Sequence, residues 1–353
     1  MPNKPSIAPR PRPTIKNVAA DAGVSVAAVS KVLRSAYGVS DGLRQKVLAS
    51  IEKLGYRPST GARGMRGNTF TIGVLLVEIA NPFLPDVLAS ITETCGTEGY
   101  KVLIGIGQGE LKLEESLIES MIDHGMDGLI LVAPQMAGAA LERFARQIPI
   151  VVLGHHESDA VSFDSVNSDD WAGTKLAVDA LYAAGHRAIE MISMTTAENT
   201  EFNVSVVREK SFATCLQGYG IGGAKQVHRM PYDSAQRQAA ILAMLAGPNR
   251  PTALFCWSDL FAVELIGLAR SRGVRVPEDM AVIGYDNSPP AAMPLIDLTS
   301  IDQNGPMIGQ VAAAALMSRI AGRTNAQHVI IKPTLSIRSS HAKIADTSAD
   351  EPK

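Results

Sequence analysis

Hydrophobic positions near the start of the chain recur with the period of short helices. Between residues 15 and 22 apolar side chains return every three or four positions, and Thr14 precedes them as an N-cap. Gly23 permits the positive φ of a sharp turn, and Ser25 can cap a second helix over 26–34. Two short helices joined by a tight glycine turn indicate a helix-turn-helix.

A third amphipathic stripe follows the first two helices. Ser40 precedes it as a cap, and the apolar positions recur at helical spacing at Leu43, Val47, Ile51 and Leu54. We therefore expect three short helices that share one small core. A small helical domain with a solvated basic face would show the same pattern, so the pattern alone does not establish DNA binding.

From Thr71 onward the pattern changes to short apolar runs that alternate with helical stretches. The runs TIGVLLV, KVLIGIG, DGLILVA and PIVVLG begin at 71, 101, 127 and 149. After a transition near Val166 the rhythm restarts with AIEMISM, TALFCWS and MAVIGYD at 188, 252 and 280. This spacing is typical of βαβ units, and it predicts two similar α/β lobes with parallel sheets.

Composition and charge sharpen this picture. A chain of 353 residues with 46% hydrophobic residues is long enough for two or three packed units. The net charge is only −2, but residues 1–66 carry twelve Lys and Arg against three Asp and Glu. That local excess of positive charge favours a nucleic-acid partner for the helical part, because phosphates attract Lys and Arg.

The second helix of a helix-turn-helix lies in the DNA major groove, with its first residues at the base edges. Val26 and Ala27 occupy those positions and would read thymine methyl groups by apolar contact, while Lys31 could reach a guanine. We expect phosphate contacts from three further side chains, Ser25, Ser30 and Arg34. Thr14 is also expected at the DNA.

The segment between the helical part and the α/β part, residues 56–70, is rich in Gly, Arg and small polar residues. A flexible linker is one interpretation. The alternative is a short helix over 60–66 that forms only on DNA, with Arg63 and Arg66 beside phosphates and Met65 as an apolar wedge in the minor groove. Both interpretations remain open at the level of sequence.

Other chemistry is sparse in the chain. Cys95, Cys215 and Cys256 are far apart and lie in apolar stretches, so we expect packed thiols and no disulfide. His155 and His156 are adjacent, so their side chains diverge, and we expect neither a metal site nor a cofactor. We find no nucleophile elbow, P-loop or secretory signal, which favours a cytoplasmic protein that is not an enzyme.

Several motifs together resemble the lactose repressor (LacI/GalR) family of bacterial transcription regulators. They run from residue 14 to residue 338 as TIKNVAADAGVSVAAVSKVL, EKLGYRP, IANPF, AAGHRAI, RVPEDMAVIGYDN and LTSIDQ. The resemblance implies a helix-turn-helix headpiece, a two-lobed core like periplasmic sugar-binding proteins, and a homodimer or tetramer on a pseudo-palindromic operator.

On this basis we expect the following organisation of the chain. A disordered extension covers 1–13, the DNA-binding domain 14–58 and the hinge 59–70, while the core covers 71–339 and a disordered tail 340–353. Within the core, the first lobe would comprise 71–167 with 299–322, and the second lobe 168–298 with 323–339.

The resemblance also implies an effector site between the two lobes. The residues that match the family's motifs, or lie beside them, are Asn81, Phe83, His155, Arg208, Trp257, Ser258 and Asp286. Arg208 and Asp286 would converge on polar groups of a sugar or a sugar acid. The sequence does not tell whether the effector releases or recruits DNA.

Three hypotheses from different classes of protein follow. The first is a DNA-binding regulator, a repressor or an activator, controlled by a small polar effector. The second is a sugar-binding protein without a DNA role, which the α/β part alone would support and the basic headpiece opposes. The third is an enzyme, which would need a convergent acid, base or nucleophile that the sequence does not offer.

Overall fold

The computed structural model describes residues 13–33, 36–57, 68–194, 201–222, 227–231, 233–248 and 250–341. The chain divides into two compact units, Met1–Thr69 and Phe70–Lys353. We call the first unit the headpiece and the second unit the core. The predicted fold class, a helix-turn-helix with two parallel α/β lobes, is confirmed.

The headpiece consists of α1 (Ile15–Ala22), α2 (Val26–Leu33) and α3 (Asp41–Leu54). Thr14 and Asn17 form a capping box at the start of α1, and Gly23 ends it with φ of 66°. Valines from all three helices meet in one core together with the ring of Tyr56. Ser50, whose hydroxyl donates to the backbone oxygen of Val18 at 3.3 Å, ties α3 to α1.

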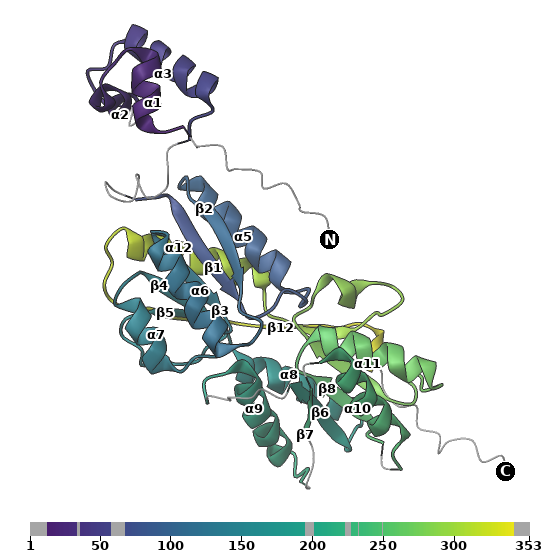
Figure 1. The fold of residues 1–353 in the computed structure, drawn as a ribbon. Helices are drawn as coiled ribbons and strands as arrows, with labels where there is room; N and C mark the ends of the chain where they lie inside the picture. Colours follow the sequence, from purple (N-terminus) through teal and green to yellow (C-terminus); the bar gives the residue numbers. More distant parts are fainter. Residues whose placement is uncertain are drawn as a thin grey trace, which may run out of the picture. The chain divides into compact units, whose positions relative to one another are not determined.

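The first lobe of the core is a six-stranded parallel sheet in the order β11-β5-β4-β3-β1-β2 (Figure 1). Its strands are β1 (Thr71–Leu76), β2 (Lys101–Ile106), β3 (Gly128–Val132), β4 (Ile150–Leu153), β5 (Asp164–Ser168) and β11 (His328–Ile331). The helices that cover it are α5 (Leu84–Thr97), α6 (Leu111–Asp123), α7 (Gly138–Ala145) and α12 (Gly305–Ile320). Apolar cores lie on both faces of this sheet.

The second lobe has a sheet in the order β12-β10-β9-β8-β6-β7. Its strands are β6 (Ile189–Met194), β7 (Val227–Met230), β8 (Ala253–Cys256), β9 (Ala281–Tyr285), β10 (Thr299–Asp302) and β12 (Thr334–Ser336), of which β12 is antiparallel to β10. The α-helices are α8 (Asp170–Ala183), α9 (Val204–Gly218), α10 (Ser234–Ala246) and α11 (Asp259–Ser271), and two short 3-10 helices are η1 (Pro289–Ala292) and η2 (Ser339–His341).

The lobe boundaries predicted for the last part of the core are wrong. β10 was expected in the first lobe but pairs with β9 in the second sheet. β11 was expected in the second lobe but pairs with β5 in the first sheet. The reason is that hydrogen bonding at a free sheet edge, which the apolar pattern does not encode, decides where a short strand joins.

The other predicted domain boundaries lie partly within and partly outside the described residues. The predicted tail from 340 onward is wrong at its first residue, because Ser340 is buried and accepts a hydrogen bond from the backbone nitrogen of Thr299 at 2.8 Å. His341 of the predicted tail is also ordered, within η2. The tail from 342 onward, most of the predicted hinge and all but the last residue of the predicted N-terminal extension lie outside the described residues. Those boundaries stay predictions.

Helix α12 returns the chain to the first lobe. It packs against α5 and against β3, β4 and β5, and it carries Ile308, Ala312 and Leu316 into the apolar core (Figure 1). The two helices approach so closely at Gly309 that a Cβ there would overlap the backbone oxygen of Val87. Glycine is therefore required at this point of the helix pair.

We expect Gly309→Ala to lower the free energy of unfolding by about 1–3 kcal/mol, because the methyl group must displace backbone. The matched control is Gly267→Ala on the exposed face of α11, where a Cβ meets nothing within 4 Å. That control should gain about 1 kcal/mol from helix propensity alone. Urea unfolding of both variants checks the pair, and equal effects would contradict the close approach.

Candidate functional site

The exposed face of α2 is the first candidate site. Ser25, Val26, Ala27 and Lys31 are exposed, with Val26 at 41% of its full accessible surface. The Ser25 hydroxyl accepts a hydrogen bond from the backbone nitrogen of Ala28 at 3.1 Å and so caps the helix, while Val29 and Val32 face the headpiece core. A helix with buried valines on one face can present its other face to a groove.

The remaining residues of the predicted DNA contact set have different outcomes. Thr14 is exposed, and its backbone nitrogen and hydroxyl both contact Asn17 Oδ1. Ser30 is only 8% exposed, because α2 turns it toward the core, and its phosphate contact stays a prediction. Arg34, Arg63 and Met65 lie outside the described residues, and so does the predicted helix over 60–66.

A pocket between the two lobes is the second candidate site. The segments that follow β1, β3, β4 and β5 of the first sheet and β8, β9 and β10 of the second sheet contribute to its lining. The pocket encloses about 720 Å³ of free space, part of which is open to solvent. The carboxyl ends of parallel strands are where open α/β sheets bind small ligands.

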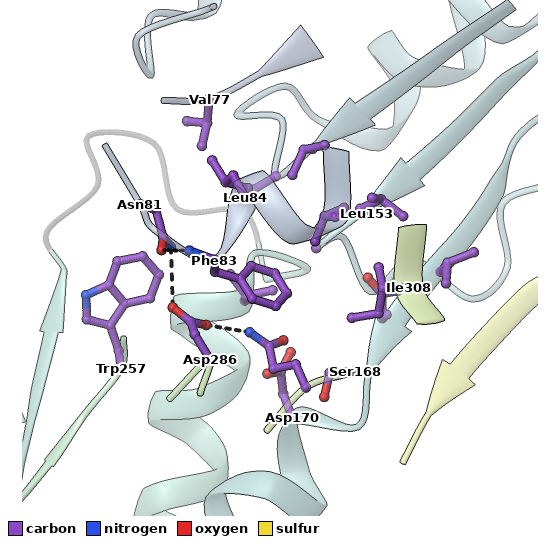
Figure 2. A pocket seen from close by; sticks show the side chains of 18 of the residues that line it. Val77, Asn81, Phe83, Leu84, Leu153, Ser168, Asp170, Trp257, Asp286 and Ile308 are labelled. Atoms are coloured by element: carbon purple, nitrogen blue, oxygen red, sulfur yellow. Dashed lines mark hydrogen bonds between the residues drawn. The ribbon is translucent and has the colours of Figure 1, made fainter. Parts of the chain in front are cut away.

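Five of the seven predicted effector residues line this pocket: Asn81, Phe83, Arg208, Trp257 and Asp286. Figure 2 shows Asn81, Phe83 and Trp257 grouped around Asp286. Asn81 donates from Nδ2 to Asp286 at 3.4 Å, and its Oδ1 accepts from the backbone nitrogen of Phe83 at 3.0 Å. The loop after β1 of the first lobe thus contacts the loop after β9 of the second lobe.

A hydrogen-bonded network crosses the second-lobe side of the pocket. Arg208 donates from Nε to Asp170 at 2.6 Å and from Nη2 to the Oε1 of Gln303 at 3.3 Å. Gln303 then donates from Nε2 to Asp286 at 2.5 Å. Arg208, Gln303 and Asp286 are therefore joined through one amide side chain, and the arginine and the aspartate do not contact each other directly in this network.

Arg208 is held on every side. It is 3% exposed, and its Nη1 donates to the backbone oxygen of Trp257 at 2.6 Å. Its Cζ lies 3.6 Å from the centre of the Tyr285 ring, within the range of a cation–π contact. Burial alone would raise the pKa of Asp170, but the charges and hydrogen bonds of Arg208 and His156 hold that pKa below its usual value.

Asp286 has a different environment. It is 5% exposed, and its φ of 112° is unusual for a residue with a side chain. Burial, together with the nearby charge of Asp259, raises the pKa of Asp286 well above its usual value. Its two carboxylate oxygens accept from the neutral amides of Gln303 and Asn81.

Two predicted effector residues lie outside the pocket lining. His155 is 1% exposed, and its Nε2 lies 3.0 Å from Glu157, while its backbone exchanges two hydrogen bonds with the side chain of Asn167. Ser258 is also 1% exposed and stands at the N-cap of α11. Neither residue lines the pocket, and the predictions that place them in contact with the ligand stay predictions.

The sequence reasoning missed Asp170 and Gln303. Asp170 follows a polar strand, DSVNS, that looks nothing like the apolar runs of the other central strands. Gln303 closes the motif LTSIDQ, which the sequence reasoning used only to identify the family. A search for polar side chains at the ends of apolar or motif segments would have found Gln303, which closes LTSIDQ.

A second connection joins the lobes beside the pocket. The backbone of His155 forms an isolated antiparallel bridge with Asn203, and the backbone nitrogen of His156 donates to Phe202 at 3.0 Å. The His156 ring nitrogen Nε2 also lies 2.6 Å from Asp170. Through these backbone and side-chain contacts, a first-lobe loop reaches the carboxylate of Asp170, which also pairs with Arg208.

Comparison with known proteins decides the family. The profile of bacterial regulatory proteins of the lacI family matches residues 14–59, and that of the periplasmic binding protein-like domain matches residues 178–341. The HTH-type transcriptional repressor PurR of Erwinia tasmaniensis is 31% identical over 334 residues, which cover 93% of this chain and 97% of the relative. The chain belongs to the lacI family of bacterial regulatory proteins.

Further relatives and solved structures agree. The ribose operon repressor of Haemophilus influenzae is 29% identical, over 93% of this chain and 98% of its own length. The transcriptional regulator CelR in complex with cellobiose superimposes with a TM-score of 0.69 at 26% identity, over 93% and 100% of the two chains. The lac repressor dimer bound to operator and the anti-inducer ONPF, at 22% identity over 93% and 99%, shows the same fold with a TM-score of 0.77.

As a lacI family member the protein is a DNA-binding transcriptional regulator with an effector-binding core. Its three cysteines are buried free thiols. The described part of the chain contains no cluster of His, Cys, Asp and Glu that could hold a metal ion. Across the same residues, no helix combines the length and the apolar character that crossing a membrane requires.

We expect Arg208→Met in this lacI family regulator to lower the free energy of unfolding by about 3–5 kcal/mol, because it leaves Asp170 buried without its cation. Adding Asp170→Asn should recover part of that loss. Arg275→Met, which removes an ion pair whose arginine is 69% exposed, is the control and should change little. Losses that simply add in the double variant would contradict the pairing.

Proposed function

We propose that this regulator represses transcription by binding a pseudo-palindromic DNA operator as a homodimer, with its affinity set by a small effector held between the core lobes. The exposed first turn of α2 carries the DNA-binding half of this proposal. The excess of Lys and Arg in the headpiece supports it, because each phosphate contact releases counterions. The protein acts in the cytoplasm, where its operator lies.

The first turn of α2 would read the operator with few hydrogen bonds. Val26 and Ala27 offer apolar contact to thymine methyl groups, and Lys31, one turn later, can donate to a guanine. The Ser25 hydroxyl and Thr14 lie at the N-termini of α2 and α1, where helix dipoles and free N–H groups favour phosphate. Two such headpieces related by a two-fold axis require two half-sites.

Effector control would follow from the construction of the pocket by both lobes. The Asn81 side chain comes from the first lobe and the Asp286 side chain from the second, and they meet at 3.4 Å. A ligand that contacts both walls binds one relative position of the lobes better than another, and it shifts the equilibrium toward that position. Such a ligand must change DNA affinity by the same factor by which DNA changes ligand affinity.

The pocket is suited to binding and not to catalysis. Among the described lining residues, Asp170 and Arg208 pair with each other, and Asp286 accepts hydrogen bonds from the side-chain amides of Gln303 and Asn81. Hydrolytic chemistry would need a nucleophile hydrogen-bonded to a base. None of the hydrogen bonds given above for these described lining residues joins such a pair. We therefore propose a regulator without enzymatic activity.

We expect Lys31→Ala to weaken binding to the best operator by about 1–3 kcal/mol and to relax the sequence preference at one base pair, because a bidentate contact to guanine is lost. Fluorescence anisotropy of the full chain against a set of single-base operator variants measures both effects.

The matched control is Lys53→Ala on α3, whose ammonium already pairs with Asp21 at 2.7 Å. This variant should retain the operator affinity and the base preference. A loss for Lys31→Ala that is uniform across all sequences would make Lys31 a phosphate contact, and no loss in either variant would contradict the proposed use of α2.

A further inference from the structure

A second pocket lies in the second lobe, on the surface between the neighbouring helices α8 and α9 (Figure 1). It encloses about 580 Å³ of free space, part of which is open to solvent. None of the described residues that line it also lines the inter-lobe pocket. The second pocket is therefore separate from the proposed effector site, and we call it the helix-pair pocket.

One face of each helix forms a wall of the helix-pair pocket. Trp171, Lys175 and Asp179 recur at every fourth position of α8, so they lie on the same side of that helix. The opposite wall consists of four residues at the C-terminal end of α9: Thr214, Cys215, Gly218 and Tyr219. Both walls thus belong to packed helices and not to loops.

Contacts toward both ends of the helix pair hold the two walls in place. Near the first turn of α8, the buried ion pair between Asp170 and Arg208 joins α8 to α9 at 2.6 Å. At the other end the Tyr219 hydroxyl donates to Asp179 at 2.7 Å, and the Tyr219 ring stacks on Tyr182 with 3.9 Å between the ring centres. The pocket is therefore pre-organised, which lowers the cost of binding a ligand.

Gly218 leaves the helix-pair pocket open. A Cβ at this position would meet nothing within 4 Å, and the residue belongs to the regular part of α9. Beside it, Cys215 is only 9% exposed, and burial raises the pKa of its thiol, so this part of the wall is uncharged. A larger side chain in place of Gly218 would enter the pocket without straining the helix.

Aromatic rings stand on both walls. The side chain of Trp171 on α8 is 51% exposed, which leaves a large apolar surface in contact with water. The ring of Tyr219 belongs to the opposite wall. Covering exposed apolar surface is favourable, and aromatic rings add offset or edge-to-face contacts with a further ring. The walls therefore favour a ligand with a flat aromatic ring.

The charges at the pocket are already balanced within the protein. Lys175 donates from Nζ to one oxygen of Asp179 at 2.5 Å, and the Tyr219 hydroxyl donates to the other oxygen. An ionic ligand would have to disrupt these contacts to gain a partner of opposite charge. A neutral ligand leaves them intact, so the electrostatics of the pocket favour an uncharged molecule.

We propose that the helix-pair pocket is a second ligand site of this regulator, and that it takes a small neutral molecule whose flat aromatic ring packs against Trp171 and Tyr219. The proposal depends neither on the DNA contacts of the headpiece nor on the ligand of the inter-lobe pocket. Filling the pocket at Gly218 should abolish this binding while the fold is retained.

The first test uses indole as the probe, because indole is neutral and consists of fused aromatic rings. Calorimetric titration of the full chain should show saturable binding with a Kd below about 1 mM. Gly218→Leu, which places a side chain in the pocket, should weaken this binding at least about tenfold, since ligand and leucine compete for one space. The matched control is Gly267→Leu on the exposed face of α11, where a Cβ also meets nothing within 4 Å.

The control should bind indole as the wild type does. Both leucine variants should melt no lower than the wild type, because leucine is a better helix former than glycine. Trp171→Ala, which removes one wall ring without filling the space, is a second variant and should also weaken indole binding. Absence of saturable binding to the wild type overturns the proposal, and so does equal binding by Gly218→Leu and Gly267→Leu.

The second test addresses the charge of the ligand. Indole-3-acetate carries the same rings with a carboxylate, and it should bind no more tightly than indole, because the Lys175 ammonium is already paired with Asp179. Tighter binding of the anion would show that Lys175 leaves Asp179 to receive it, and the neutral ligand class would then be wrong. Neither test involves DNA, so its outcome leaves the proposed repressor function unaffected.

Discussion

The buried ion pair between Asp170 and Arg208 is the interaction on which the rest of the pocket depends. Neither charge could remain at this depth alone, because desolvation of an unpaired ion costs several kcal/mol. Once the pair forms, the remaining donors of Arg208 fix the Trp257 backbone and Gln303, and Gln303 fixes one oxygen of Asp286. The positions of the polar groups that line the pocket are thus set, one after another, from this salt bridge.

This network also links the two lobes. Gln303 lies on the connection between β10 of the second sheet and α12 of the first lobe, and Asp170 directly follows β5 of the first sheet. His156, from a first-lobe loop, contacts the second oxygen of Asp170. A change in lobe position would therefore move partners of the ion pair.

The headpiece was predictable from sequence because its determinants are local. The cap at Thr14, the turn at Gly23 and the valine stripes act within a few residues, and the observed helix bounds agree with the predicted ones to within a residue where the chain is described. Ser30 was the exception. Its burial depends on how α2 packs within the headpiece, which a local signal does not contain.

In the core the sequence determined the alternation of strands and helices, and with it the two α/β lobes, since apolar runs of strand length report burial on both faces. Tertiary structure alone decided three other features. The polar strand β5 exists because its neighbours β4 and β11 satisfy its backbone, and β10 and β11 joined the sheets opposite to those expected because free edges accepted them. The partner of Arg208 is 38 residues away in the chain, and a contact over that separation is set by folding and not by any local pattern of residues.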